Sequence, residues 1–321
     1  MNITDRPPTW KILLAFATIY FVWGSTFLAI RVGVREVPPF LLAGMRFGFA
    51  GLALYGWMRA SGTPAPSRRE WVGVSALGAL IFVFDYGCLF WAEQRVPSGI
   101  AAVVLATVPV FIALLEIGIL RTHRLTIRLA AALAIGIAGV AVLMNNSLSL
   151  GEAPVDRAGA AALLVAAFTW SVATILTRRL KLPASKSMSA AAQMLVGGLL
   201  LFLVAGISGE FTNFHAAAVS TRAWFGLFYL ITAGSIAGFT AYIWLLHYES
   251  PTKVGTYAYV NPVVAVVLGY FCGDETLGLR TLLGTLSVLV SVVVITTIPR
   301  KTVLVSTPQP AAADVQAAEG D

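Results

Sequence analysis

Charged residues are scarce in this chain of 321 residues. Asp, Glu, Lys and Arg together make up 12% of the sequence, and hydrophobic residues make up 58%. The charged share is about half of the ~25% that is usual in a soluble domain. A globular protein with so few charges could not cover its surface with polar groups. The composition therefore excludes an ordinary soluble domain.

Histidine and cysteine are also rare, with three and two residues. The chain has no P-loop, no His-Glu-x-x-His motif, no metal-binding cysteine spacing and no nucleotide-binding glycine fingerprint. Cys88 and Cys272 lie within hydrophobic segments, where we expect packing rather than a disulfide or a metal pair. We therefore predict that the protein is not an enzyme, and we expect neither a metal nor a cofactor.

Hydrophobic segments make up most of the chain instead. Each approaches the ~20 residues with which a helix crosses ~30 Å of hydrocarbon. They are apolar on all sides, whereas barrel strands alternate in polarity. The sequence predicts an all-α integral membrane protein with ten transmembrane helices, at 12–30, 39–58, 71–92, 96–120, 129–150, 158–177, 187–208, 223–246, 254–273 and 281–298.

The net charge of +7 follows the expected membrane topology. With the N-terminus in the cytoplasm, 15 Lys and Arg residues fall on that side and six on the other. The positive-inside rule then predicts a multi-pass protein with both termini cytoplasmic, and no nucleic-acid partner. Residues 1–11 form the cytoplasmic N-terminus. Residues 300–321, rich in Ala and polar residues, are expected to form a disordered cytoplasmic tail.

The two halves of the chain resemble each other at a nearly constant offset. Trp23 and Trp170 are 147 residues apart, and the run at 50–52 matches that at 197–199 at the same offset. Pro109 and Pro262 are 153 residues apart, and Pro97 and Pro251 are 154 apart. We expect two five-helix repeats, at 12–150 and 151–299. Because five is odd, the second repeat would be inverted in the membrane, as in alternating-access carriers.

Several motifs resemble one family. They are the run Trp23–Arg31, the segment Pro38–Phe47, Val96–Val104 with Pro109, and Tyr257–Pro262 with Glu275–Leu277. Together they resemble EamA-type transporters of the drug/metabolite transporter superfamily over residues 12–298. The resemblance implies two five-helix repeats around a cavity built largely from helices 1, 3, 4, 6, 8 and 9. It also implies export of small metabolites across the bacterial inner membrane.

Three ionisable residues lie inside the predicted spans, where a charge costs at least ~2.5–3.5 kcal/mol. Asp85 is a candidate protonatable or cation-pairing site, with Tyr86 beside it as a hydroxyl partner. The alternative is a structural role for Asp85, either in an ion pair with Arg46 or in hydrogen bonds to neighbouring helices. For Arg46 we favour a structural or gating role, and for Glu116 a position near the interface.

Aromatic and hydroxyl side chains are the other candidates for substrate binding. Trp23 and Trp170 lie mid-span at equivalent positions, whereas aromatic belts lie at span ends. An aromatic wall with a few hydroxyls suits an amphipathic or amino-acid-like ligand. The alternative is that the two Trp side chains simply pack. The further candidates are Ser25, Thr26, Ser171 and Thr174, with Tyr257, Tyr259 and Asn261.

Prolines and paired glycines lie at positions where they can affect the bending and packing of the helices. Pro262 and Pro109 can kink their helices and act as paired hinges. Gly-x-x-x-Gly pairs at 44/48, 234/238 and 269/273 allow close helix packing, which we expect to be mainly intramolecular. We expect a monomer or weak dimer.

The sequence thus predicts a secondary transporter that exports a small-molecule substrate across the lipid bilayer, with protons as a candidate coupling ion. The alternatives are an uptake carrier of the same fold and a non-transporting membrane enzyme or scaffold.

Overall fold

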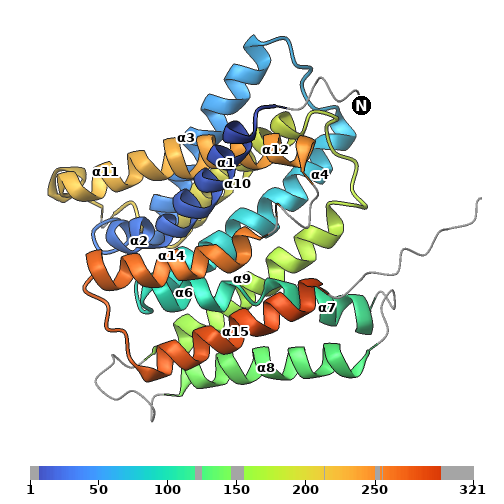
Figure 1. Ribbon diagram of the computed structural model, residues 1–321. Helices are drawn as coiled ribbons and strands as arrows, with labels where there is room; N and C mark the ends of the chain where they lie inside the picture. The colour runs from blue at the N-terminus through green and yellow to red at the C-terminus, as the bar shows by residue number, and fades with distance from the viewer. Residues whose placement is uncertain are drawn as a thin grey trace, which may run out of the picture.

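A computed structural model describes residues 7–119, 125–145, 155–212, 214–249, 254 and 256–297. Within these ranges the chain is helical and contains no strand (Figure 1). The predicted tail, the first six residues of the N-terminal segment and Pro251 lie outside the described residues.

The helices follow the predicted apolar segments closely. Nine are long and apolar enough to cross a membrane, within the described ranges, and α14 is a shorter apolar helix of 16 residues. Three long helices are continuous across a change of helix type, and the fourth segment is broken into α6 and α7. The elements are α1 (Thr9–Ala17), η2 (Thr18–Val22), α2 (Trp23–Gly33), α3 (Pro39–Ala60), α4 (Arg68–Gly78), η3 (Ala79–Tyr86), α5 (Gly87–Glu93), α6 (Ser98–Leu105), α7 (Val108–Gly118), α8 (Ile127–Met144), α9 (Arg157–Leu176), α10 (Lys186–Ile207), η5 (Ala216–Ala218), α11 (Thr221–Tyr229), η6 (Leu230–Ala237), α12 (Gly238–Tyr248), α14 (Tyr257–Cys272) and α15 (Leu279–Thr297).

Glycines bring α3 and α10 into backbone contact. A Cβ on Gly198 would lie 2.3 Å from the backbone nitrogen of Gly48, and one on Gly51 would lie 2.4 Å from that of Leu195. No larger residue fits these two positions without moving a helix. Gly44 and Gly48 also leave room for the ring of Phe202 on α10. The predicted intramolecular role of the Gly44/Gly48 pair is therefore confirmed.

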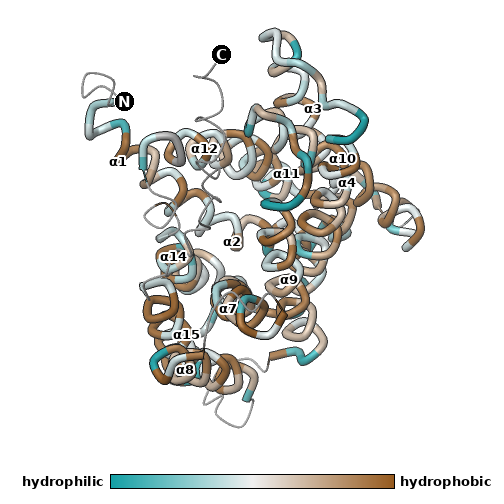
Figure 2. The backbone as a smooth tube through the Cα atoms, turned by 90° about the vertical axis from the view of Figure 1, so that its right-hand side faces the viewer, coloured by the Kyte–Doolittle hydropathy of each residue, from teal (hydrophilic) through white to brown (hydrophobic). Residues whose placement is uncertain are grey.

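A second helix pair, α8 and α15, lies along the opposite edge of the molecule in Figures 1 and 2. Gly139 faces the backbone of Val288, and Gly136 faces Ser291, whose hydroxyl donates to the carbonyl of Ala132 at 2.6 Å. The helices α6, α9 and α14 lie between these two pairs in Figure 1. Each pair joins one helix from either half of the chain.

The outer surface is apolar. Figure 2 shows hydrophobic segments along the outside of the helices, and large side chains such as Phe49, Leu52 and Leu203 are more than half exposed. The opposite faces of the same helices are buried. Such a surface suits contact with lipid chains rather than water. Cys272, for which we expected a packing role, is exposed at the end of α14, and Cys88 is partly buried.

Candidate functional site

Two π-helical segments occupy matching places in the two halves of the chain. The segments η3 and η6 each contain eight residues and begin at Ala79 and Leu230, 151 residues apart. A third, η2, interrupts the first long helix. π-Helical turns are rare and occur often at functional sites, because the extra residue per turn redirects side chains. The residues around η3 and η6 are therefore candidates for a functional site.

Trp23 lies at the centre of one aromatic group. Its ring centroid lies 5.0 Å from that of Tyr257, 5.4 Å from that of Tyr242 and 5.7 Å from that of Phe239. Its indole nitrogen donates to the carbonyl of Gly234 in η6, at 3.1 Å. The group thus joins α2 of the first half to η6, α12 and α14 of the second.

Two residues with hydroxyl groups, Ser25 and Thr26, follow Trp23 closely in α2. The hydroxyls of Ser25 and Tyr229 are 2.6 Å apart, and the Ser25 hydroxyl also donates to the carbonyl of Val22. Thr26 is buried, and its hydroxyl donates to the carbonyl of Trp23 at 2.6 Å. Both predicted residues therefore lie beside Trp23, at the contact between α2 and α11–η6.

Gly234 and Gly238 create the space for this contact. A Cβ on Gly238 would lie 2.3 Å from the indole nitrogen of Trp23, and one on Gly234 would lie 2.9 Å from a methyl group of Thr26 and 3.3 Å from a guanidinium nitrogen of Arg46. Gly234 in η6 and Gly238 at the start of α12 therefore let side chains of the first half pack against the backbone of these two segments.

Arg46 is buried at the other side of η6. It is 2% exposed, and its Nε donates to the hydroxyl of Ser235 at 3.1 Å. Its guanidinium carbon lies 4.7 Å from the ring centroid of Phe47 and 5.3 Å from that of Tyr86, which are cation–π distances. Arg46 thus connects η6 to a second aromatic group.

This second group contains Tyr86 and Trp170. The Tyr86 ring lies 4.6 Å from that of Phe47, 5.8 Å from that of Phe82 and 6.3 Å from that of Trp170. Trp170 therefore contacts Tyr86, while Trp23 contacts Tyr257. The two Trp residues that match by sequence offset belong to separate groups of rings.

Asp85 is 4% exposed, but it does not pair with Arg46. In the described part of the chain its carboxyl takes part in no hydrogen bond and no ion pair. The alternative of a structural Asp85–Arg46 ion pair is therefore wrong for this structure. The two residues lie on different helices, and Arg46 is directed toward Ser235 instead.

Asn261 and Pro262 lie in α14 behind the Trp23 group. Asn261 is 8% exposed, and its amide, when oriented to donate, reaches the carbonyls of Tyr20 at 3.1 Å and Tyr257 at 3.2 Å. The orientation of the amide is assigned from these neighbours. Pro262 lies inside the helix, as predicted. Asn261 thus links α14 to η2.

Pro109 follows the break between α6 and α7. Proline has no N–H for the carbonyl four residues earlier, here Leu105, which is the last residue of α6. Ser171 is fully buried beside this break, and its hydroxyl donates to the carbonyl of Val108 at 3.1 Å and to that of Ala167 at 2.7 Å. Ser171 therefore holds α9 against the start of α7.

Two further predicted site residues are not part of the ring contacts. The hydroxyl of Tyr259 is hydrogen-bonded to that of Thr296 on α15. Thr174 is exposed, and its hydroxyl donates to the carbonyl of Trp170 at 2.9 Å. Thr174 therefore contacts the second group only through the main chain of Trp170, and the hydroxyl of Tyr259 is directed toward α15.

Glu93 and Arg31 were missed by sequence reasoning. Glu93 was counted outside the span 71–92, yet it is the last residue of α5 and is completely buried. Arg31 lies just beyond the predicted span 12–30, yet it belongs to α2 and donates to the main-chain carbonyl of Glu93. A signal for Glu93 was present, because Asp85, Leu89 and Glu93 follow at intervals of four residues and form one buried stripe.

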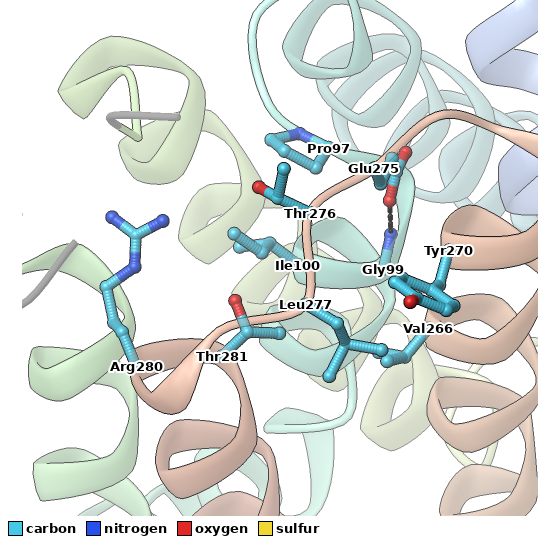
Figure 3. A pocket seen from close by; sticks show the side chains of 10 residues that line it. All are labelled: Pro97, Gly99, Ile100, Val266, Tyr270, Glu275, Thr276, Leu277, Arg280 and Thr281. Atoms are coloured by element: carbon cyan, nitrogen blue, oxygen red, sulfur yellow. Dashed lines mark hydrogen bonds between the residues drawn. The ribbon is translucent and has the colours of Figure 1, made fainter. Parts of the chain in front are cut away.

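A small pocket lies at the ends of α6 and α14 (Figure 3). Its lining is Pro97, Gly99, Ile100, Val266, Tyr270, Glu275, Thr276, Leu277, Arg280 and Thr281. Figure 3 shows the carboxylate of Glu275 directed at Gly99, whose N–H donates to it at 3.1 Å. Among the described residues, no group of three His, Cys, Asp or Glu could hold a metal ion.

The sequence matches the EamA-like transporter family at residues 9–145 and again at 157–297. The chain belongs to this family. The inner membrane transporter YedA of Escherichia coli K12 is 36% identical over 82% of this chain and 83% of its own length. The protein PecM of Dickeya dadantii is 26% identical, over 85% of this chain and 88% of its own. The predicted family resemblance is confirmed, and the chain is a multi-pass membrane protein.

A solved crystal structure has a similar fold. It is 22% identical in sequence, with a TM-score of 0.59, and the alignment covers 92% of this chain and 100% of the other. At this identity the likeness shows the helical fold alone.

Proposed function

We propose that this EamA-family protein is a secondary transporter. It exports small organic metabolites or amino-acid-like amphipathic compounds across the bacterial inner membrane by alternating access. The proposal includes ten transmembrane helices, with α14 as the ninth, in two inverted five-helix repeats and with both termini in the cytoplasm. The protein is not an enzyme in this proposal.

The observation that carries the proposal is the reciprocal packing of α3 and α10. At the offset of 147 residues, Gly51 corresponds to Gly198 and Gly48 to Leu195. Gly198 lies on the backbone of Gly48, and Gly51 lies on that of Leu195. Each contact becomes the other when the repeats are exchanged, which is the pattern that a twofold axis produces. Repeats related in this way can exchange conformations, and this exchange is the basis of alternating access.

Helix breaks at matching places support movement between the repeats. The segments η3 and η6 match, and Pro109 and Pro262 interrupt the bonding of their helices. Helices bend at such positions at low cost. In our proposal Arg46, held by Ser235 and by two rings, is a gating or structural residue.

The Trp23 group supports a substrate with both apolar and polar parts. Trp23 and Tyr257 offer ring faces and edges, and Ser25 and Asn261 offer polar atoms nearby. In our proposal Tyr86 and Trp170 form a second region that contacts the substrate. Asp85 precedes Tyr86 in the chain and belongs to the same region. Aromatic walls with a few convergent polar groups are typical of small-molecule sites.

Transport in liposomes tests the proposal. Purified protein is reconstituted and loaded with labelled metabolites that were first selected by an efflux screen in expressing cells. Export without chemical change is expected. Transport only in the inward direction would indicate an uptake carrier. Chemical change of the labelled compound would indicate an enzyme, and no transport of any compound would indicate a non-transporting scaffold.

A matched pair of variants tests the site. Trp23→Ala should weaken transport several-fold, because a ring contact contributes about 0.5–1.5 kcal/mol beyond its buried area. Trp57→Ala is the control, since Trp57 is 69% exposed on the outer surface of α3. Equal transport by both variants would remove Trp23 from the site.

Reporter fusions test the topology. Fusions after Arg69 and Lys181 should report the cytoplasm, and fusions near Asp156 and Thr212 should report the periplasm. A cytoplasmic result at 156 would contradict the five-plus-five arrangement.

A further inference from the structure

Unpaired charged atoms gather at one place in the described structure. Among the described residues, five buried side-chain nitrogen and oxygen atoms make no hydrogen bond. Four of these five atoms belong to Arg31, Arg46 and Glu93. They are Nε of Arg31, Nη1 of Arg46 and both carboxyl oxygens of Glu93. Buried polar groups are normally hydrogen-bonded, so this concentration calls for an explanation.

Glu93 is the most unusual member. It is 0% exposed, and neither of its carboxyl oxygens meets a donor. An ionised carboxylate buried without hydrogen bonds costs several kcal/mol, even beside an opposite charge. A neutral carboxylic acid costs far less, because the penalty of desolvation falls mainly on the charge. This environment therefore favours the protonated form of Glu93.

Two cations are nevertheless close enough to support the ionised form. The positive charges of Arg31 on α2 and Arg46 on α3 favour the ionised form of Glu93, whereas the negative charge of Glu275 on the α14–α15 connection disfavours it. Arg31 already donates to the main-chain carbonyl of Glu93. The guanidinium of Arg31 therefore already contacts Glu93 and is a candidate partner for its ionised carboxylate.

The other helices around α5 add few charges. The segment η3 carries Asp85 and Tyr86, roughly two turns from Glu93. The helix α9 carries Arg157 at its start, and α6 carries no charged residue. Asp85 differs from Glu93, because neither guanidinium bonds to it: Arg46 bonds to Ser235, and Arg31 bonds to Glu93. Glu93 is thus the carboxyl that has an environment for either protonation state.

We propose that Glu93 is the proton-binding site that couples transport to a pH gradient, with Arg31 and Arg46 as the partners of its ionised form. Complete burial leaves room for a proton but not for a metal or an organic cation. When the carboxyl O–H bond breaks, the proton passes to water on the side that has opened, and a guanidinium neutralises the carboxylate. This inference rests on the proposed transport function only for its physiological role.

The test begins with the protein in lipid and without substrate. Infrared difference spectra are recorded while the pH is raised from mildly acidic to alkaline. Wild type should show a carboxylic acid C=O band that disappears with rising pH. The band should be absent in Glu93→Gln, shifted in Glu93→Asp, and unchanged in Glu36→Gln, whose carboxyl is exposed. The Glu93→Asp variant keeps the test valid if Glu93→Gln folds poorly.

Three results would overturn the proposal. The first is an identical band in wild type and both Glu93 variants. The second is a Glu93 band that does not change with pH, which would mean a permanently neutral side chain. The third is a Glu93 carboxylate that is already ionised at mildly acidic pH, as a static or water-bridged ion pair with Arg31 would be.

A second measurement separates this inference from the proposed function. With a substrate identified, Glu93→Gln should lose accumulation driven by a pH gradient and keep counterflow exchange, and Glu93→Asp should restore part of the accumulation. Transport by wild type without any pH effect would overturn the coupling role and leave the transport function standing. A titrating Glu93 in a protein that moves no compound would instead contradict the transport function.

Discussion

Helix N-termini at the two ends of the molecule are stabilised in different ways. The helices α4, α8 and α10 begin after Ser67, Thr126 and Ser185, whose hydroxyls accept from a backbone N–H three residues later. The helices α3 and α6 begin after Pro38 and Pro97, which provide no side-chain cap. We call the first set the hydroxyl-capped starts and the second set the carboxylate-capped starts. The helix α11 combines both, because the hydroxyl of Ser220 accepts from the N–H of Ala223 at 3.2 Å and also bonds to a carboxylate of the first half.

Carboxylates from the other half of the chain cap this second set. Glu275 accepts from the N–H of Ser98 at 2.6 Å, from its hydroxyl at 2.7 Å and from the N–H of Gly99. Glu210 accepts from the N–H of Leu41 at 2.8 Å. Both acids follow a helix of the second half and bind a helix of the first.

The third carboxylate belongs to the first half of the chain and binds the start of a helix in the second half. Glu36, after α2, accepts from the N–H of Ser220 at 2.6 Å and from its hydroxyl at 2.7 Å, just before α11. The end of α2, the start of α11 and the α14–α15 connection gather on the left of Figure 1.

The two kinds of cap identify the end of the molecule at which the two halves are held together. A hydroxyl cap stabilises its own helix wherever that helix moves. A carboxylate cap adds attraction to the positive end of the helix dipole, but only while the two halves remain in contact. We therefore expect the carboxylate-capped end to be the closed end of this structure.

The largest effect is expected for Glu275→Ala. It leaves the N–H and hydroxyl of the fully buried Ser98 without an acceptor, and it should lower the free energy of unfolding by about 3 kcal/mol. Thermal unfolding in detergent measures the loss. Hydrogen exchange should accelerate at residues 98–104 and stay unchanged at 68–74. Equal acceleration at both places would remove the distinction between the two ends.

Glu210→Ala should have a smaller effect, about 1–2 kcal/mol, because it removes two weaker bonds. Partial burial raises the pKa of Glu210, so its carboxyl stabilises the fold most below its ordinary pKa. This contribution decreases as the pH rises through the raised pKa. The stability difference between wild type and variant should therefore shrink from acidic to neutral pH, and a growing difference would contradict the prediction.

Ser67→Ala provides the comparison from the hydroxyl-capped starts. Loss of this cap should lower the free energy of unfolding by about 1 kcal/mol. The effect should stay within α4, because Ser67 and Glu70 bond only to each other's backbone in a capping box. Exchange at residues 68–74 should rise, with no change at 98–104. A change at the distant site would show that this end also couples the two halves.

Glu36→Gln should have the smallest effect, since Glu36 is exposed to solvent. Hydrogen bonds from the backbone and hydroxyl of Ser220 lower its pKa. Its stabilisation is therefore complete above the ordinary carboxyl pKa and is lost as the pH falls through the lowered value. Wild type and variant should converge in acid, opposite to the trend for Glu210. Parallel pH profiles for the two carboxyls would contradict this assignment.

The spans could be predicted from the sequence because each is a local property. Runs of apolar residues of bilayer length predicted the long helices, and the structure begins most of them within three residues of the expected position. Family motifs such as Trp23–Arg31 were equally visible. The mid-span position of Trp23 also pointed correctly to an interior contact, since its ring packs against Tyr257.

Contacts between distant residues could not be predicted in the same way. Asp85 and Arg46 were natural partners by charge, but Arg46 bonds to Ser235 on η6. The separation of Trp23 from Trp170 likewise depends on which helices pack together. Nor does any local pattern show that η3 and η6 are π-helical, since that requires knowing the register of each backbone hydrogen bond.

The membrane class, the family and the length of the helices follow from the order of residues, because hydrophobicity and motif spacing act along the chain. Which charges are buried and which are paired depends on how the helices pack. Glu93 lies one residue beyond a predicted span and looked like a loop charge. Its burial comes from the neighbouring helices α2, α3 and α9, which pack around α5 and exclude water, an effect that no short stretch of sequence contains.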